Sequence, residues 1–311
     1  MAAQAVIAGS VFAQDYPSRP IRYIVPYSAG GSTTFTARLV GQRLTEVWAQ
    51  QVIVDNRPGA DTMIGTEIGV RAKPDGYTLM YIGSVLAANQ VLLKPPYDAR
   101  RDIAPIATIA SFENLLAVHP SVPVKTLSEF IALAKARPGE LNYATSSRGG
   151  STHLAVELIN TVAGIKTQPI PYKGGGPAVA DVVGGQVQFI MAVPVNIVAH
   201  VKGGRLRAIA VAGEARLAAL PDVPTFTEAG LPGISMPTWH GIGAPSGTPK
   251  VIISRISREV EKFVAMPETR KQLDSQGFVP YYNNPDQTAA LIANEFVRVA
   301  KVVKDAHIKV E

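Results

Sequence analysis

Three times along this chain, an apolar strand-like segment runs into a loop of Gly, Ser and Thr and then into an amphipathic helical pattern. Such a loop leaves backbone N–H groups and hydroxyls at the positive end of a helix, a position that favours an anion such as a carboxylate. None of the loops carries a nucleophile paired with a base. The pattern therefore predicts a protein that binds a small anion and releases it unchanged. The three loops span residues 28–34, 145–152 and 173–176.

The bulk composition excludes several classes of protein. With 311 residues, the chain is long enough for two domains and a large core. Its net charge is +6, but Lys and Arg are scattered singly, without a basic stripe interleaved with aromatics, so we expect no nucleic-acid partner. The absence of cysteine excludes disulfides and thiolate chemistry. The five histidines show no ligand spacing, so we expect neither a metal nor another cofactor.

The N-terminus reads as a targeting segment. Residues 5–13 are apolar and end in small residues, with Val11 and Ala13 at the −3 and −1 positions of a cleavage site. The basic region that usually precedes such a stretch is missing, since the first Arg is Arg19. We interpret residues 1–13 as a signal-peptide remnant and expect the mature protein to be exported and soluble. A disordered tail is the alternative interpretation.

Strand-like and helix-like segments alternate along almost the whole chain, a pattern typical of parallel α/β layers. Stretches rich in Pro at residues 119–124 and 220–233 set off a middle α/β unit. Just after the first stretch, a capping box formed by Thr126 and Glu129 predicts the start of a helix. Two crossings between domains also suit closure on a ligand in the cleft between them. We therefore expect domain 1 at residues 14–120 plus 236–311, and domain 2 at residues 121–235.

An ordered set of short motifs resembles the tripartite tricarboxylate transporter receptors, also called the Bug family. Any one motif is weak, but the set in this order is highly specific and runs from about Tyr16 to Lys309. The resemblance implies an α/β, bilobed periplasmic-binding-protein fold (type 2-like), with two α/β domains joined by two hinge crossings. It also implies a periplasmic receptor, expected to be a monomer, that delivers a carboxylate to membrane permease subunits. The motifs are residues 16–21, 24–27, 56–60, 74–79, 138–143, 171–174, 184–187, 221–225, 229–230 and 244–249.

The same resemblance implies which loops bind the ligand. In that family the first loop and the middle-domain loop bind carboxylates, largely through backbone N–H groups and water. Each residue also has a purely structural interpretation: Ser32 or Thr33 as a helix N-cap, Phe35 as a core residue, Arg148 as a solvated side chain. Trp239 and His240 fit core packing at least as well as ligand contact. We expect ligand contact from Tyr27, Ser28, Ala29, Gly30, Gly31, Ser32, Thr33, Thr34, Phe35, Ser84, Ser146, Ser147, Arg148, Gly149, Gly150, Ser151, Thr152, Lys173 and Gly174.

Departures from the family pattern indicate the type of ligand. Many members carry Asp where this chain has Thr34 and Ala192, and a small or amide residue where it has Arg148. Two fewer carboxylates and one more guanidinium favour a ligand with more negative charge and no ammonium group. Phe35, with Tyr27 and Trp239 nearby, is expected to form an apolar wall. We therefore expect a dicarboxylate or an aromatic carboxylate rather than an amino acid.

Two alternatives stay open. The closed lobes could dock on a sensor kinase of a two-component system instead of a permease, with the same binding chemistry. An α/β hydrolase using a loop Ser with His153 or His240 is a weaker alternative, because the chain has no G-x-S-x-G nucleophile elbow.

Overall fold

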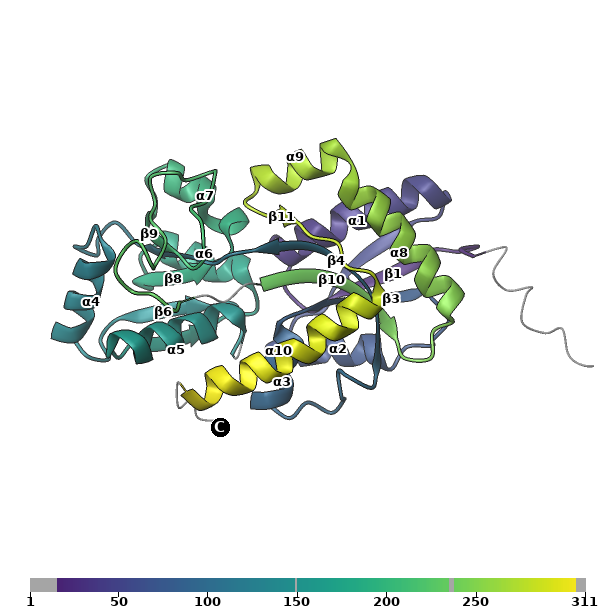
Figure 1. Cartoon of the computed structure of the whole chain (residues 1–311), viewed down its shortest axis with the longest axis horizontal. Helices are drawn as coiled ribbons and strands as arrows, with labels where there is room; N and C mark the ends of the chain where they lie inside the picture. Colours follow the sequence, from purple (N-terminus) through teal and green to yellow (C-terminus); the bar gives the residue numbers. More distant parts are fainter. Residues whose placement is uncertain (1–15, 149, 235–237, 306–311) are drawn as a thin grey trace, which may run out of the picture.

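The computed structural model describes residues 16–148, 150–234 and 238–305, and they form two lobes side by side (Figure 1). Each lobe contains one β-sheet with helices on both faces. This confirms the expected bilobed α/β fold. The predicted signal-peptide remnant at residues 1–13 lies outside the described residues. Within the described residues, no helix is both long enough and apolar enough to cross a membrane.

The first lobe is built on a six-stranded sheet. Strands β1, β2 and β3 pair in parallel, whereas β10 runs antiparallel to both β3 and β4. In spatial order the strands are β11 (Val279–Pro280), β4 (Ile103–Phe112), β10 (Thr238–Pro245), β3 (Thr78–Gly83), β1 (Ile21–Val25) and β2 (Val52–Asn56).

The second lobe is built on a five-stranded sheet. Strand β6 pairs in parallel with β7 and β8, whereas β5 runs antiparallel to β8 and β9. In spatial order the strands are β7 (Gln168–Pro171), β6 (Asn142–Thr145), β8 (Phe189–Ala192), β5 (Leu115–Val118) and β9 (Arg207–Val211).

The chain passes between the sheets twice, after Phe112 of β4 and again between Val211 of β9 and Thr238 of β10. The strands that follow these crossings, β5 and β10, are antiparallel to their neighbours in the sheet. The domain limits at residues 120 and 235 stay a prediction. They assign β5 to domain 1, whereas its strand pairing places β5 in the second sheet.

Helices sandwich both sheets. In the first lobe, α1 (Ser32–Trp48), α8 (Lys250–Ala265) and α9 (Pro267–Ser275) share one apolar cluster, and α2 (Met63–Val70), α3 (Val85–Leu92) and α10 (Pro285–Asp305) share another. In the second lobe, α4 (Leu127–Ala136) and α5 (Ser151–Ala163) cover one face of the sheet, and α6 (Gly175–Val183) and α7 (Pro194–Lys202) cover the other.

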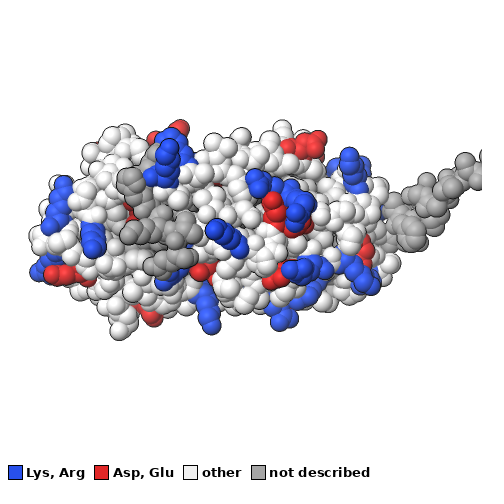
Figure 2. Space-filling model, turned by 90° about the horizontal axis from the view of Figure 1, so that it is seen from below, with Lys and Arg blue, Asp and Glu red and all other residues white. Residues whose placement is uncertain are grey.

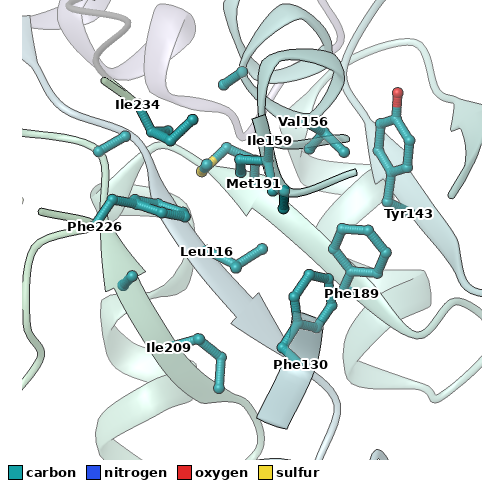
Figure 3. Packing of buried hydrophobic residues seen from close by; sticks show 14 of the residues in the cluster. Leu116, Phe130, Tyr143, Val156, Ile159, Phe189, Met191, Ile209, Phe226 and Ile234 are labelled. Carbon is teal, nitrogen blue, oxygen red and sulfur yellow. The ribbon is translucent and has the colours of Figure 1, made fainter. Parts of the chain in front are cut away.

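The second-lobe core also reaches the first lobe. Figure 3 shows its aromatic centre, where Phe130, Tyr143 and Phe189 pack together. The same cluster includes Leu92 of α3 and Val299 of α10. Helix α10 packs against β4 and α3 and touches α5, so it bridges the two lobes (Figure 1).

The face of the molecule in Figure 2 carries Lys and Arg interspersed with Asp and Glu. Opposite charges also pair elsewhere in the sequence, as in Arg100–Asp98 and Arg101–Asp102, with nitrogen–oxygen distances of 3.2 and 2.6 Å. Charge on this face is therefore mixed rather than gathered into a basic stripe.

Candidate functional site

A cavity of about 50 Å³ lies between the lobes and is lined from both sides. Its wall combines hydroxyl, amide and aromatic groups with an apolar strip from β8. The lining residues are Tyr27, Gly31, Ser32, Thr33, Tyr81, Ser84, Val85, Phe112, Ser146, Gly150, Ser151, Thr152, Gly175, Ala178, Ile190, Met191, Ala192, Val193, Asn196, Thr238 and His240.

Five helices begin at this cavity: α1 and α3 from the first lobe, and α5, α6 and α7 from the second. The first N–H groups of a helix have no partner within the helix, and they carry the positive end of its dipole. Within the described part of the chain, no side chain forms a capping hydrogen bond at any of these five N-termini. The expected caps Ser32 and Thr33 instead lie inside α1, and the N-cap residue is Gly31. Helix starts without a side-chain cap therefore converge on the cavity from both lobes.

The two lobes approach each other closely beside the cavity. A Cβ atom placed on Gly31 would lie 3.9 Å from the Gly175 nitrogen and 4.0 Å from the Gly176 nitrogen. The Ser28 N–H also donates to the Lys173 carbonyl oxygen over 3.0 Å. The first and third glycine-rich loops therefore face each other directly, and the start of α1 lies against the start of α6.

The lining carries no full charge. Of the described residues around the cavity, none is Asp, Glu, Lys or Arg. Val85, Phe112, Ile190 and Met191 provide apolar lining. An anion in this space is stabilised by neutral donors and helix dipoles, and a ligand ammonium would find no carboxylate partner.

His240 and Tyr81 lie on the first-lobe side. The imidazole is buried, and its Nδ1 lies 3.0 Å from Thr36 Oγ1. Burial lowers the pKa of His240 to about 3, so the ring is neutral at physiological pH. Burial likewise raises the pKa of Tyr81 well above its ordinary value, with smaller contributions from Tyr27 and Tyr23. Both groups therefore act as neutral hydrogen-bonding groups.

Tyr27 stands at the boundary between the cavity and its mouth. The pKa of Tyr27 is raised above its ordinary value, mainly by burial, and the nearby Ser147 hydroxyl offsets part of the rise. Its ring packs edge-on against Tyr81 with the centroids 5.9 Å apart. The residue lines both the cavity and the outer pocket.

The mouth differs from the interior because it is charged. A pocket of about 220 Å³ there is lined from the first lobe by residues 59–62 and from the second by Lys173 and its neighbours. The Arg148 N–H donates to Asp61 Oδ1 over 2.7 Å, which ties the middle loop to the first lobe. Asp61 lies in a run of left-handed residues, with φ of 43° at Ala60, 50° at Asp61 and 78° at Thr62. Such a run is strained in non-glycine residues.

Nine of the eighteen expected residues that the structure describes do not line the cavity. Ser28 and Lys173 join the lobes, and Arg148 is exposed with its N–H on Asp61. The Asn56 amide donates to buried Thr34 Oγ1 over 2.8 Å, and Phe35 stacks on Phe278 at 5.9 Å. Gly149 lies outside the described residues. The others are Ala29, Gly30, Ser147 and Gly174. The nine that line it are Tyr27, Gly31, Ser32, Thr33, Ser84, Ser146, Gly150, Ser151 and Thr152.

Twelve lining residues were not expected from the sequence as ligand contacts. Most belong to strand ends or to helix starts without a glycine-rich signature, such as Tyr81 on β3 and Asn196 on α7. The sequence could have indicated two of them as ligand contacts: Gly175 lies in the third glycine-rich loop, and Ala192 is a departure from the family pattern. His240 was left open between core and ligand contact, and the structure shows it buried and on the cavity wall.

The chain is similar to known proteins over nearly its whole length. The chain is 36% identical over 312 residues to protein BugT of Bordetella pertussis, a match that covers 99% of this chain and 96% of that protein. Its fold matches Rpa4515 of R. palustris, solved with adipate, with a TM-score of 0.92 and 32% identity over 94% of this chain and 99% of that one.

A second solved structure is MatC from Rhodopseudomonas palustris with bound malate, with a TM-score of 0.87 and 30% identity, covering 93% of this chain and 100% of that one. Residues 36–308 match the family described as tripartite tricarboxylate transporter family receptor. These similar proteins are receptors that bind solutes, and not enzymes. The chain therefore belongs to the tripartite tricarboxylate transporter receptor family.

Proposed function

We propose that this protein is a periplasmic receptor that closes its two lobes on a small organic carboxylate and delivers it to the membrane subunits of a tripartite tricarboxylate transporter. The observation that carries the proposal is the convergence of five uncapped helix N-termini, from both lobes, on one cavity without charged side chains. Adipate and malate in the similar structures support a carboxylate as the ligand.

Binding would follow from simple electrostatics. Each carboxylate oxygen receives N–H and O–H donors from helix starts such as Ser32 and Ser151. Charge-assisted hydrogen bonds contribute about 1.5–3 kcal/mol each, so a few of them give micromolar affinity after the entropy cost of binding. Because the donors come from both lobes, opening of the lobes removes part of the binding energy and allows release.

The lining also favours the expected ligand type. A dicarboxylate or aromatic carboxylate can place its carbon atoms against Ile190, Met191 and Phe112. An amino acid would place its ammonium group in a space where no lining residue of the described chain is acidic. The cavity is small, about 50 Å³, and both lobes line it, so ligand entry requires the lobes to open.

A sensor kinase as the partner of the closed lobes is the second candidate, because the same closed state could dock on either partner. A hydrolase has no support: the hydroxyl that contacts buried His240 belongs to Thr36, which lies outside the cavity lining.

A thermal-shift screen tests the proposal. The panel contains dicarboxylates, aromatic carboxylates, glutamate and aspartate, each beside its neutral amide where one exists. A carboxylate at 100 times its dissociation constant is expected to add about 2.7 kcal/mol to the free energy of unfolding. No response to any carboxylate would contradict the proposal, and so would tight binding of the amino acids alone.

A further inference from the structure

His240 presents a neutral imidazole to the cavity inside a cage of aromatic rings. The ring centroids of Phe112 and Tyr81 lie 4.8 and 5.1 Å from that of the imidazole, both edge-on, and the centroid of Phe278 lies at 5.6 Å. The residue is 2% exposed, and β10 fixes its backbone between β3 and β4. The ring is therefore held in one place, and its hydrogen bonding depends on which nitrogen carries the proton.

The contacts of Thr36 favour one position of the proton on the His240 ring. Its Oγ1 lies 3.0 Å from Nδ1 of His240 and 3.3 and 3.2 Å from the carbonyl oxygens of Ser32 and Thr33. A hydroxyl has one hydrogen, and a carbonyl oxygen can only accept. When the hydroxyl donates to a carbonyl oxygen, it is free to accept a hydrogen bond from Nδ1–H, and every contact is attractive. The opposite tautomer would turn the hydroxyl hydrogen toward Nδ1 and leave Oγ1 facing two carbonyl oxygens.

The second ring nitrogen is left for the ligand. Among the described residues, none forms a hydrogen bond with Nε2 of His240. This atom is also not fully buried, because it is absent from the buried polar atoms that have no partner. His240 lines the cavity, whereas Thr36 lies behind it. With the proton on Nδ1, Nε2 carries a lone pair, which repels a carboxylate oxygen and accepts a hydrogen bond from a donor.

We propose that His240, held in one tautomer by Thr36, is a specificity-determining residue that selects carboxylates carrying a neutral hydrogen-bond donor, above all short hydroxycarboxylates. The proposal rests on the carboxylate-binding function proposed above and specifies its ligand. The helix starts hold the carboxylate, and the ligand hydroxyl donates to Nε2. A cationic donor is disfavoured because none of the described lining residues is acidic. The small cavity further favours a compact ligand.

Matched ligand pairs test the proposal by calorimetric titration. The pairs are lactate and propionate, malate and succinate, and 2-hydroxyglutarate and glutarate, which differ only in one hydroxyl. We expect the hydroxy acid to bind about tenfold more tightly than its partner in every pair that binds, as one extra buried hydrogen bond provides.

Variants at Thr36 separate this effect from general fit. Thr36→Val keeps the side-chain shape but removes the hydroxyl, so the ring can adopt either tautomer, and the preference is expected to fall below about threefold. Thr36→Ser keeps the hydroxyl and is expected to retain the preference. In the ligand-free wild type, ¹⁵N spectra of histidine-labelled protein should show Nδ1 protonated and Nε2 bare, which provides a readout independent of the ligand.

The possible results distinguish the role of His240 from the carboxylate-binding function. Equal or tighter binding of the deoxy acid, a protonated Nε2 in the wild type, or an unchanged preference in Thr36→Val would overturn the role of His240 while leaving a carboxylate receptor in place. Binding of some other carboxylate, but of no hydroxy acid, would also overturn it. Failure of every carboxylate to bind would overturn the proposed function as well.

Discussion

Helices α4 and α5 belong to the same lobe but begin in opposite ways. At the start of α4, the Glu129 N–H donates to Thr126 Oγ1 over 3.2 Å, and the Glu129 carboxylate accepts from the Lys125 N–H over 2.6 Å. Helix α5 begins at Ser151, and its N-cap residue Gly150 has no side chain; among the described residues, no side chain caps this helix. The start of α4, called here the outer helix start, has its N–H groups capped by the chain's own side chains. The start of α5 at the cavity, called the inner helix start, has no such side-chain cap. The difference supports the proposal that the N–H groups at the start of α5 bind the ligand.

The largest expected effect comes from giving an inner helix start its own anion. Gly31 has φ of −89° and ψ of 176°, which other residues adopt without strain, and a Cβ there clears the second lobe by 3.9 Å. Gly31→Asp is expected to weaken carboxylate binding by about 100-fold, because the new carboxylate competes for the same donors and repels the ligand. Calorimetric titration measures this loss.

The matched control is Gly31→Asn, which has the same size without the charge and should cost only about tenfold. Thermal unfolding should show that Gly31→Asp is at least as stable as the wild type, because an acidic N-cap stabilises a helix. Equal affinity losses in the two variants would indicate a steric effect and contradict the electrostatic comparison.

The charged mouth is expected to act on release rather than on recognition. Asp61→Gly removes the acceptor of the Arg148 N–H, and Gly tolerates the φ of 50° at this position. We expect the dissociation rate of the ligand to rise about fivefold, with little change in the association rate, since the lost bond joins the closed lobes. Stopped-flow fluorescence measures both rates.

Asp61→Asn keeps an acceptor oxygen and a residue type that tolerates the left-handed conformation, so its rates should stay near those of the wild type. A large change in the association rate in either variant would show that the mouth takes part in recognition.

The outer helix start should affect stability alone. Thr126→Ala removes the cap of α4 and is expected to cost about 1 kcal/mol, which lowers Tm by about 2–4 °C. Carboxylate affinity should remain within twofold of the wild type. A clear loss of affinity in this variant would contradict the distinction between outer and inner helix starts.

The smallest expected effect concerns the crossing between the lobes. Burial, together with nearby Glu214, raises the pKa of Glu113 to about 7, against the opposing charge of Arg298. A raised folded-state pKa means that the contribution of Glu113 to stability is complete below its ordinary value near 4.5 and is lost as the pH rises through 7. Glu113→Gln cannot ionise, so its Tm should match that of the wild type at pH 4.5 and exceed it at pH 8.

Thermal scans across this range provide the measurement. The buried neutral His240 lowers the stability of both proteins as the pH falls from 6.5 toward 3, so its effect cancels between them. A Tm difference that is the same at pH 4.5 and pH 8 would contradict the assignment to Glu113.

Much of the fold follows from local sequence rules. The alternation of strand and helix patterns predicts the layers, and the capping box predicts the start of α4 at Leu127. Helix α9, with only Thr269 and Leu273 buried, has too weak an apolar pattern to be predicted. The left-handed run at residues 60–62 carries Asp and Thr where the sequence rule expects Gly.

The site was predictable in outline but not residue by residue. Local rules identify the glycine-rich loops as helix starts, and nine of their residues and neighbours line the cavity. Whether a loop residue faces the cavity or the other lobe depends on how the lobes pack, as Lys173 and Ser28 show. The position of Phe35 depends on Phe278, more than 240 residues away in the chain. No local pattern contains such information.

The central claim is that helix starts from both lobes hold one anion. A ¹H–¹⁵N correlation spectrum of the protein, titrated with a carboxylate that binds, tests it most directly. The account predicts that the amide signals of Ser32 and Thr33 in the first lobe and of Ser151, Thr152 and Gly175 in the second shift together at one stoichiometric equivalent. Shifts confined to one lobe, or strong shifts only at the mouth around Asp61, would contradict it.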